Sequence, residues 1–390
     1  MKLSFLPIFI SLLSGALVKS TDEDSLSLTD ATSAIFSYFD SGSGTDLSMY
    51  LRFDDGLLEG PRGFFPIGGG SILGFSMAAT SKLILSEGTR LFVRDPFENA
   101  NTVSMYDTNP YGALLLDTAD SGGNFPCSLT SSGDVIYVLN CAFNDDGTAD
   151  GAGAPSVTAF RVEGRLKKNL RRLPNFSRAL TEYENQGGSQ IGITPNGKFL
   201  IVAIHGRSSP EAGALVVFSL NSFGQPSKEP VYVLDSLNQP VAFEFAVYNG
   251  KTFVYAVTLG DATMLAYRVE ENGSLSFVSS AVGSPDGPRA GLCWIARYGN
   301  YLYGTNAPLS SVSSWVIDPS DGSASLLEVE AATEGLKVPY DVLASDSILY
   351  VVNRVGGTIT QFEIADDGSL NYLIETGVGA TGGIALVNFE

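Results

Sequence analysis

A short turn phrase recurs seven times along this chain and constrains its fold more than any other feature. Each copy joins the end of one apolar, strand-like segment to the next through a turn that carries glycine. Successive turn glycines lie 46 to 60 residues apart. They are Gly56, Gly112, Gly164, Gly224, Gly273, Gly322 and Gly368. A strand-rich unit repeated about every 50 residues is typical of a β-propeller, in which each repeat forms one four-stranded blade.

A second hairpin inside each repeat supports the same architecture. Pairs such as Asn-Gly and Ser-Gly permit the positive φ angles of tight hairpins, and Val, Ile, Tyr and Phe suit the strands beside them. Such segments occupy residues 132–140, 196–204, 249–257, 298–306 and 345–353. No long amphipathic helical pattern interrupts them. The sequence therefore predicts an all-β fold.

The two ends of the chain complement each other. Residues 382–388 are typical of the innermost strand of a blade, and no second strand of that blade follows them. Residues 33–38 are typical of a second strand, and no first strand precedes them. Pairing the two segments would remove two exposed sheet edges, which otherwise favour aggregation. We therefore expect residues 33–390 to form one seven-bladed β-propeller domain, closed by pairing of the N- and C-terminal strands in one blade.

The amino terminus has the pattern of a secretory signal peptide. Lys2 precedes an apolar stretch over residues 3–18, and a small-residue cleavage site follows at 18–20. Residues 21–32 then form an acidic leader, which we expect to be flexible. No later segment approaches 18 uninterrupted apolar residues, so we expect no membrane span. The predicted location is extracellular, either secreted or associated with the cell wall.

The net charge of the chain limits the classes of partner that it is expected to bind. The formal net charge of −19 becomes −21 when Lys2 and Lys19 leave with the signal peptide. Nucleic acid and anionic membranes bind mainly through Lys and Arg, so neither is expected as a partner. A highly anionic metabolite is disfavoured for the same reason, unless basic residues gather in one pocket. We expect a small-molecule or carbohydrate ligand, and a closed ring without evident edges predicts a monomer.

Two segments match the N-glycosylation acceptor pattern, at Asn175 and Asn272. Asn272 lies on a predicted outer hairpin tip, which makes it the better candidate acceptor.

The three cysteines leave two alternatives open. Cys127 and Cys141 lie on neighbouring strands of one predicted hairpin. Regular register places Cys127 opposite about residue 138, roughly 10 Å from Cys141, so a disulfide requires a bulge. Otherwise both are small buried thiols. Cys293, beside Trp294, is expected in the core.

Propellers bind ligands at a mouth of the central channel, which is lined by the starts of innermost strands and the ends of second strands. We expect ligand-binding side chains among these positions. The candidate second-strand ends are Asn140, His205, Thr258, Asn306 and Asn353, and the candidate innermost starts are Gln190, Gln239, Arg289, Tyr340 and Asp341. Arg354 follows a second-strand end, and with Arg289 it could hold a carboxylate. For both arginines, ion pairing at the rim is the alternative.

Three residues are candidate catalytic groups. His205 is the single histidine, suited to acid–base chemistry near neutral pH, although it could instead order a turn as Asn does in other blades. Glu244 interrupts an apolar inner strand, so it either lines a watery channel or acts as an acid or base. Arg289 could hold an anion. One histidine excludes a His-rich zinc site, and this chemistry requires no metal or cofactor.

The carboxyl-terminal repeats resemble a known family. Residues 349–353, 357–364 and 367–370 are similar to lactonase-type seven-bladed propellers, which include phosphogluconolactonases and carboxymuconate cyclases. Cys293-Trp294 followed by residues 301–306 resembles the secreted branch. The phosphogluconolactonase-like members typically carry Gly-Pro-Arg-His, whereas this chain has Gly287-Pro-Arg-Ala290. The resemblance implies Arg289 as an anion ligand without its histidine neighbour.

Two functions remain open at this point. The first is a secreted lactonase-like or cycloisomerase-like enzyme that hydrolyses or cyclises a small lactone or carboxylate, with His205 or Glu244 as acid or base and Arg289 holding the anion. The second is a non-catalytic extracellular propeller that binds a glycan, protein or small ligand. A pocket where acid–base groups meet an arginine would favour the enzyme, and a shallow mouth with exposed aromatics would favour the binder.

Overall fold

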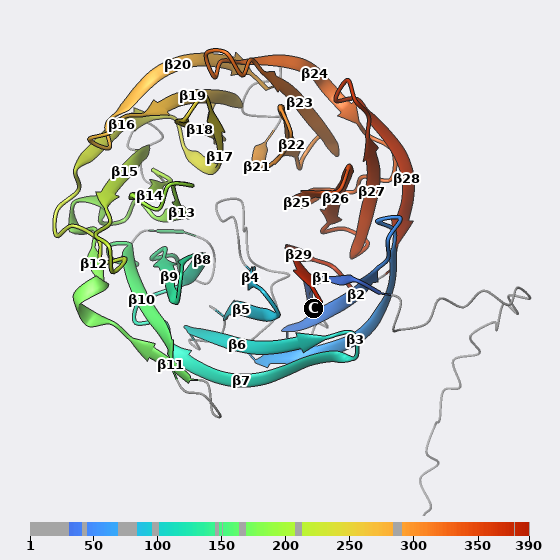
Figure 1. The fold of residues 1–390 in the computed structure, drawn as a ribbon, viewed down its shortest axis with the longest axis horizontal. Helices are drawn as coiled ribbons and strands as arrows, with labels where there is room; N and C mark the ends of the chain where they lie inside the picture. Colours follow the sequence, from blue (N-terminus) through green and yellow to red (C-terminus); the bar gives the residue numbers. More distant parts are fainter. Residues whose placement is uncertain are drawn as a thin grey trace, which may run out of the picture.

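Seven sheets form a ring in the computed structural model of the chain (Figure 1). The structure describes residues 31–40, 45–68, 84–95, 101–144, 148–149, 151–163, 169–206, 213–283, 291–377 and 379–389. The predicted all-β, seven-bladed propeller is confirmed. In the described part of the chain, no helix is both long and apolar enough to cross a membrane.

The blades are numbered in chain order, each given from its innermost strand outward. Blade 1 contains β29 (Gly382–Asn388), β1 (Ser33–Asp40), β2 (Thr45–Arg52) and β3 (Leu58–Gly68). Blade 2 contains β4 (Ile84–Glu87), β5 (Arg90–Asp95), β6 (Thr102–Asn109) and β7 (Gly112–Asp120). Blade 3 contains β8 (Pro126–Ser132), β9 (Val135–Asn140), β10 (Ser156–Glu163) and β11 (Asn169–Arg172), with β12 (Arg178–Ala179) also paired to β10 and two short 3-10 helices at Pro174–Phe176 and Thr181–Tyr183.

The remaining four blades each have four consecutive strands. Blade 4 contains β13 (Gly188–Ile193), β14 (Phe199–Ile204), β15 (Gly213–Ser219) and β16 (Tyr232–Leu237). Blade 5 contains β17 (Pro240–Tyr248), β18 (Lys251–Thr258), β19 (Thr263–Val269) and β20 (Leu275–Val282). Blade 6 contains β21 (Leu292–Tyr298), β22 (Tyr301–Asn306), β23 (Ser311–Ile317) and β24 (Ala324–Ala332), and blade 7 contains β25 (Pro339–Ser345), β26 (Ile348–Asn353), β27 (Thr358–Ile364) and β28 (Leu370–Thr376).

Blade 1 joins the two ends of the chain, as the sequence predicted. β29 pairs antiparallel with β1, in a register that runs from Ser33 opposite Asn388 to Tyr38 opposite Gly382. The N–H of Thr381 donates to the carbonyl oxygen of Tyr38 at 2.6 Å. The ring is therefore held closed by backbone hydrogen bonds between residues more than 340 positions apart in sequence.

The hydrophobic core lies between neighbouring blades. Every residue of β26 is buried, whereas most of the outermost strand β28 is exposed. Second strands need apolar side chains on both faces because a blade packs on each side of them. This explains why the sequence shows continuous apolar runs there rather than alternation.

The repeated turn glycines serve a contact between blades that we call the tyrosine latch. A tyrosine three residues before the end of a second strand donates its hydroxyl hydrogen to the carbonyl oxygen of the turn glycine in the next blade. The distance is 2.9 Å from Tyr255 to Gly322, 2.9 Å from Tyr303 to Gly368, and 2.6 Å from Tyr350 to Gly56. Tyr137 makes the same contact with Gly224. Burial raises the pKa of all four phenols, so they remain protonated donors at neutral pH.

Removing one tyrosine latch is expected to destabilise the ring measurably. The Tyr303→Phe change leaves the buried carbonyl of Gly368 without its donor, which costs about 1–3 kcal/mol of unfolding free energy. The midpoint of urea unfolding measures this loss. Tyr111→Phe is the matched control, because the side chain of Tyr111 is 74% exposed. Equal midpoints for the two variants would contradict a stabilising latch.

The structure resolves the open question about Cys127 and Cys141 in favour of a disulfide. The hairpin register begins with Ser132 opposite Val135, so the expected pairing of Cys127 with residue 138 was wrong. A bulge between Pro126 and Ser128 leaves Cys127 as the extra residue. The bulge brings the Cα atoms of the two cysteines to 5.8 Å, within the usual range for a bridge. Cys293 is buried in the core, as expected.

Candidate functional site

A cavity of about 360 Å³ lies inside the ring, among the innermost strands β4, β17, β21, β25 and β29. Most of its lining is apolar, from side chains such as Ile295, Leu343 and Leu386. Among the described residues, its ionisable lining groups are Glu244, Arg297 and Asp341. Its volume is within the range that suits a small organic ligand.

Glu244 reaches this cavity because of its place on β17. It lies between Phe243, which is fully buried, and Phe245, and it pairs across the hairpin with Tyr255. Side chains alternate across a strand, so Glu244 points the opposite way from both phenylalanines. The carboxylate is partly exposed within the ring, where contact with water keeps the cost of its charge low.

Arg297 is the channel residue that the sequence analysis missed. It lies near the end of β21, and its guanidinium is held by two backbone carbonyls. Nε donates to the oxygen of Phe245 at 2.9 Å, and Nη1 donates to the oxygen of Gly299 at 2.5 Å. A charged residue in an otherwise apolar innermost strand was the available signal, and it is the same signal that identified Glu244.

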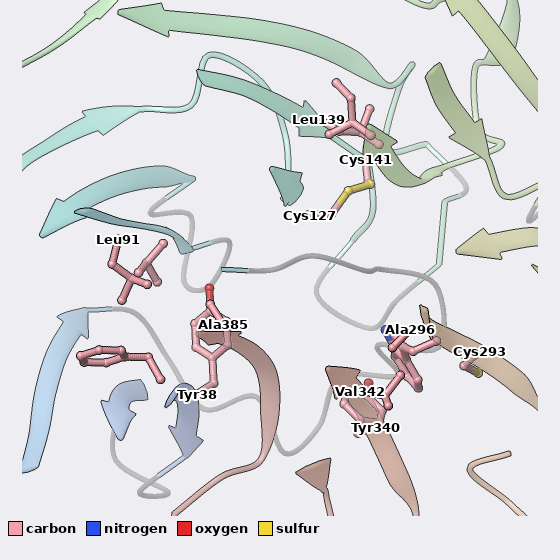
Figure 2. Close-up of a cluster of buried hydrophobic side chains, with 14 of the residues drawn as sticks. Tyr38, Leu91, Cys127, Leu139, Cys141, Cys293, Ala296, Tyr340, Val342 and Ala385 are labelled. Atoms are coloured by element: carbon pink, nitrogen blue, oxygen red, sulfur yellow. A yellow bond between two sulfur atoms is a disulfide. The ribbon is translucent and has the colours of Figure 1, made fainter. Parts of the chain in front are cut away.

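Asp341 and Tyr340 lie at the start of β25. Oδ1 of Asp341 accepts the N–H of Val342 at 2.9 Å, and the side chain lines the cavity. The ring of Tyr340 packs against Trp294 with centroids 4.4 Å apart, and the guanidinium carbon of Arg354 lies 5.0 Å from the centroid of Tyr340. Figure 2 shows Tyr340 on β25 in the same cluster as Cys293 on β21. Both aromatic rings are buried, so this end of the channel shows no exposed aromatic patch in the described residues.

Asn306 and Asn353 occupy the predicted ends of β22 and β26, but they bind their own blades. Nδ2 of Asn353 donates to Oγ1 of Thr358 at 3.1 Å and of Thr360 at 2.7 Å. Nδ2 of Asn306 similarly donates to the hydroxyls of Ser311 and Ser313. Both asparagines are fully buried. They order the turn between second and third strands.

His205 lies one residue beyond the end of β14. In blade 4 it is Ile204, opposite Ala214, that corresponds to these asparagines. His205 is fully buried, and its backbone N–H donates to the carbonyl of Gly187 at 2.8 Å. It is not among the described residues that line the cavity. Arg289 lies outside the described residues.

A second arginine that the sequence analysis did not select is Arg94, near the end of β5. Its guanidinium carbon lies 5.5 Å from the ring centroid of Tyr38 and 5.9 Å from that of Phe125. Burial lowers the pKa of Arg94, partly offset by Tyr38, Asp95 and Tyr340. Tyr38 also donates its hydroxyl to the backbone carbonyl of Arg94 at 2.6 Å. This cluster joins blades 1, 2 and 3.

The two candidate glycosylation residues are both exposed. Asn272 lies on the turn between β19 and β20, as expected of an outer tip, and its Oδ1 accepts hydrogen bonds from Ser274. Asn175 lies in the short helix Pro174–Phe176. No cluster of His, Cys, Asp and Glu in the described segments could hold a metal ion.

The chain is similar to known proteins in sequence over part of its length and in fold over most of it. Residues 235–382 match the family described as lactonase, 7-bladed beta-propeller. A periplasmic gluconolactonase from Pseudomonas aeruginosa superimposes with a TM-score of 0.68 at 14% identity, over 91% of this chain and 99% of that chain. A candidate 6-phosphogluconolactonase from Bacteroides fragilis gives 0.65 at 17% identity, over 93% and 100%. No curated protein sequence matches the chain.

At such identities the structural likeness shows the fold alone. The family match covers the repeats whose motifs indicated the resemblance. The resemblance to lactonase-type seven-bladed β-propellers is therefore confirmed, with the family's sequence pattern over residues 235–382 and its fold over the described chain.

Proposed function

We propose that this protein hydrolyses a small lactone inside the central channel, with Glu244 as the general base. The observation that carries the proposal is the cavity of about 360 Å³, in which two carboxylates and a guanidinium occur on an otherwise mostly apolar lining. Convergent charged groups in an apolar cavity are typical of an active site. Buried Trp294 and Tyr340 give no support to the alternative of a shallow aromatic binding surface.

The chemistry needs only water and this chain's side chains. Glu244 would take a proton from water as the water oxygen bonds to the carbonyl carbon of the lactone. The tetrahedral intermediate then breaks the ring C–O bond, and the ring oxygen receives the proton from Glu244. The product is a hydroxy acid, which ionises at neutral pH. His205 has no part in this scheme because Glu244 lines the cavity and His205 does not.

We further propose that the protein works outside the cell. The signal-peptide pattern of residues 1–20 supports export. The bridge between Cys127 and Cys141 supports an oxidising compartment, since disulfides persist mainly there. Exposed Asn272 would be available for glycosylation in that route.

The test is to measure the rate of lactone hydrolysis by the purified parent protein and by the Glu244→Gln variant. A panel of δ- and γ-lactones, with muconate cyclisation as a second assay, is followed by proton release and by absorbance. We expect Glu244→Gln to lower kcat about a hundredfold or more, within the usual contribution of a general base. Glu328→Gln is the matched control, because Glu328 is exposed on the outermost strand β24.

Full activity in folded Glu244→Gln would reject Glu244 as the base. If the folded parent protein turned over nothing in the panel, the non-catalytic binding propeller would be the better account.

A further inference from the structure

We infer that Arg297 stabilises the negative charge that develops on the carbonyl oxygen of the substrate, and that the substrate is an uncharged lactone rather than a phosphorylated one. This inference rests on the proposed lactone hydrolysis and assigns a residue and a substrate class to it.

Arg297 is close to Glu244 in the fold. Its Nε donates to the carbonyl of Phe245, the residue directly after Glu244, across the boundary between β21 and β17. Both side chains line the same cavity. A base and a positive group on neighbouring innermost strands can therefore act on one bound ligand.

The guanidinium is also fixed in place. Two carbonyl oxygens from different blades hold it, at 2.9 Å and 2.5 Å, and Tyr248 donates its hydroxyl to the same oxygen of Gly299 at 3.5 Å. A donor that needs no rearrangement during the reaction stabilises the transition state most effectively. Arginine suits this role because it stays charged and presents several N–H groups in one plane.

The charges of the described lining residues favour an uncharged ligand. Among the described lining residues, two carboxylates, Glu244 and Asp341, face one guanidinium, Arg297, so the formal sum is −1. The whole chain carries −19. A phosphate group would place negative charge beside Glu244 and Asp341, whereas a neutral lactone brings none. Its oxygen becomes negative only in the transition state, where Arg297 can act.

The first experiment compares Arg297→Gln and Arg297→Lys with the parent protein on a neutral δ-lactone. An interaction made only in the transition state lowers kcat with little change in KM. We expect Arg297→Gln to lower kcat about 10²- to 10³-fold, as for loss of an oxyanion donor, and Arg297→Lys to recover part of it. Arg268→Gln is the matched control, since Arg268 pairs with Glu270 outside the channel. An unchanged kcat in Arg297→Gln would overturn the assignment.

The second experiment compares glucono-δ-lactone with its 6-phosphate. We expect the neutral lactone to have a kcat/KM at least about a hundredfold higher, and Asp341→Asn to narrow that ratio by removing one negative charge. Equal or faster turnover of the phosphate would overturn the substrate class.

A binding measurement separates this inference from the proposed function. Gluconolactam is uncharged and is not hydrolysed, and its affinity is measured by calorimetry. Binding of the lactam by the parent protein, without any lactone turnover, would reject the catalytic function and retain recognition of an uncharged ring. Turnover that is indifferent to Arg297 would reject the inference and retain the function.

Discussion

Deleting residues 380–390 is expected to prevent the protein from folding. The deletion removes β29, the innermost strand of blade 1, and leaves the backbone of β1 without its partner on one side. It also uncovers Ile35 and Phe36, which are fully buried in the closed ring. An open ring with an exposed apolar strand edge tends to aggregate. The yield of soluble protein and the far-ultraviolet circular dichroism of the truncated chain measure the effect.

A pair of point variants tests the same closure without shortening the chain. Val387 is fully buried opposite Ala34, whereas the neighbouring Asn388 is exposed. Val387→Asp places an unpaired charge in the core and is expected to cost more than about 4 kcal/mol, a large part of the stability of a typical domain. Asn388→Asp should melt like the parent. A truncated protein that is soluble and melts like the parent would refute closure by β29.

Gly322→Ala is expected to produce the second largest loss. Gly322 has a φ of 80°, and a Cβ at this position would overlap the ring of Phe253. The backbone conformation costs about 1–2 kcal/mol for a residue with a side chain, and overpacking adds about 1–3 kcal/mol. Together they predict a loss of about 2–5 kcal/mol. Chemical denaturation of the purified variant measures it.

Gly250→Ala provides the control for this variant. Gly250 has a φ of 72°, close to that of Gly322, but nothing lies within 4 Å of a Cβ placed there. Its substitution therefore shows the backbone cost alone, about 1–2 kcal/mol. The excess loss in Gly322→Ala reports the packing of the turn against blade 5. If both variants lost the same stability, steric contact with Phe253 would not explain the repeated glycine.

The sequence was sufficient to predict the ring because the relevant signals are local. Glycine at position 322 and at the similar turns indicates a positive φ by its residue type alone. The turn recurs about every 50 residues along the chain. Ring closure followed from two segments that lacked partners, residues 33–38 and 382–388. What the sequence did not reveal is why the glycine carbonyl matters, since its tyrosine partner lies in another blade.

The candidate site was harder to predict because its side chains contact residues that are distant in sequence or that are placed by strand register. Glu244 was identified because a charge in an apolar strand is visible locally. Arg297 is likewise a charged residue in an apolar strand, but it was missed. The carbonyl of Phe245 to which it donates lies 52 positions away in the sequence. Asn306 and Asn353 were expected to face a ligand, yet hydroxyls on the third strands of their own blades accept their amide hydrogens. That pairing depends on register across a turn, which residue types alone do not fix.

The place of β29 in the ring also sets a rule for biosynthesis. Blade 1 takes its innermost strand, β29, from residues 382–388, which are synthesised after every other described strand of the ring. During translation β1 leaves the ribosome before β29. Until β29 has been synthesised, β1 has no strand to pair with on that side. Through that interval its free edge remains open to wrong pairing, so correct closure depends on keeping the nascent chain apart from its neighbours. A chain that stops before residue 382 lacks β29, and therefore cannot close the ring.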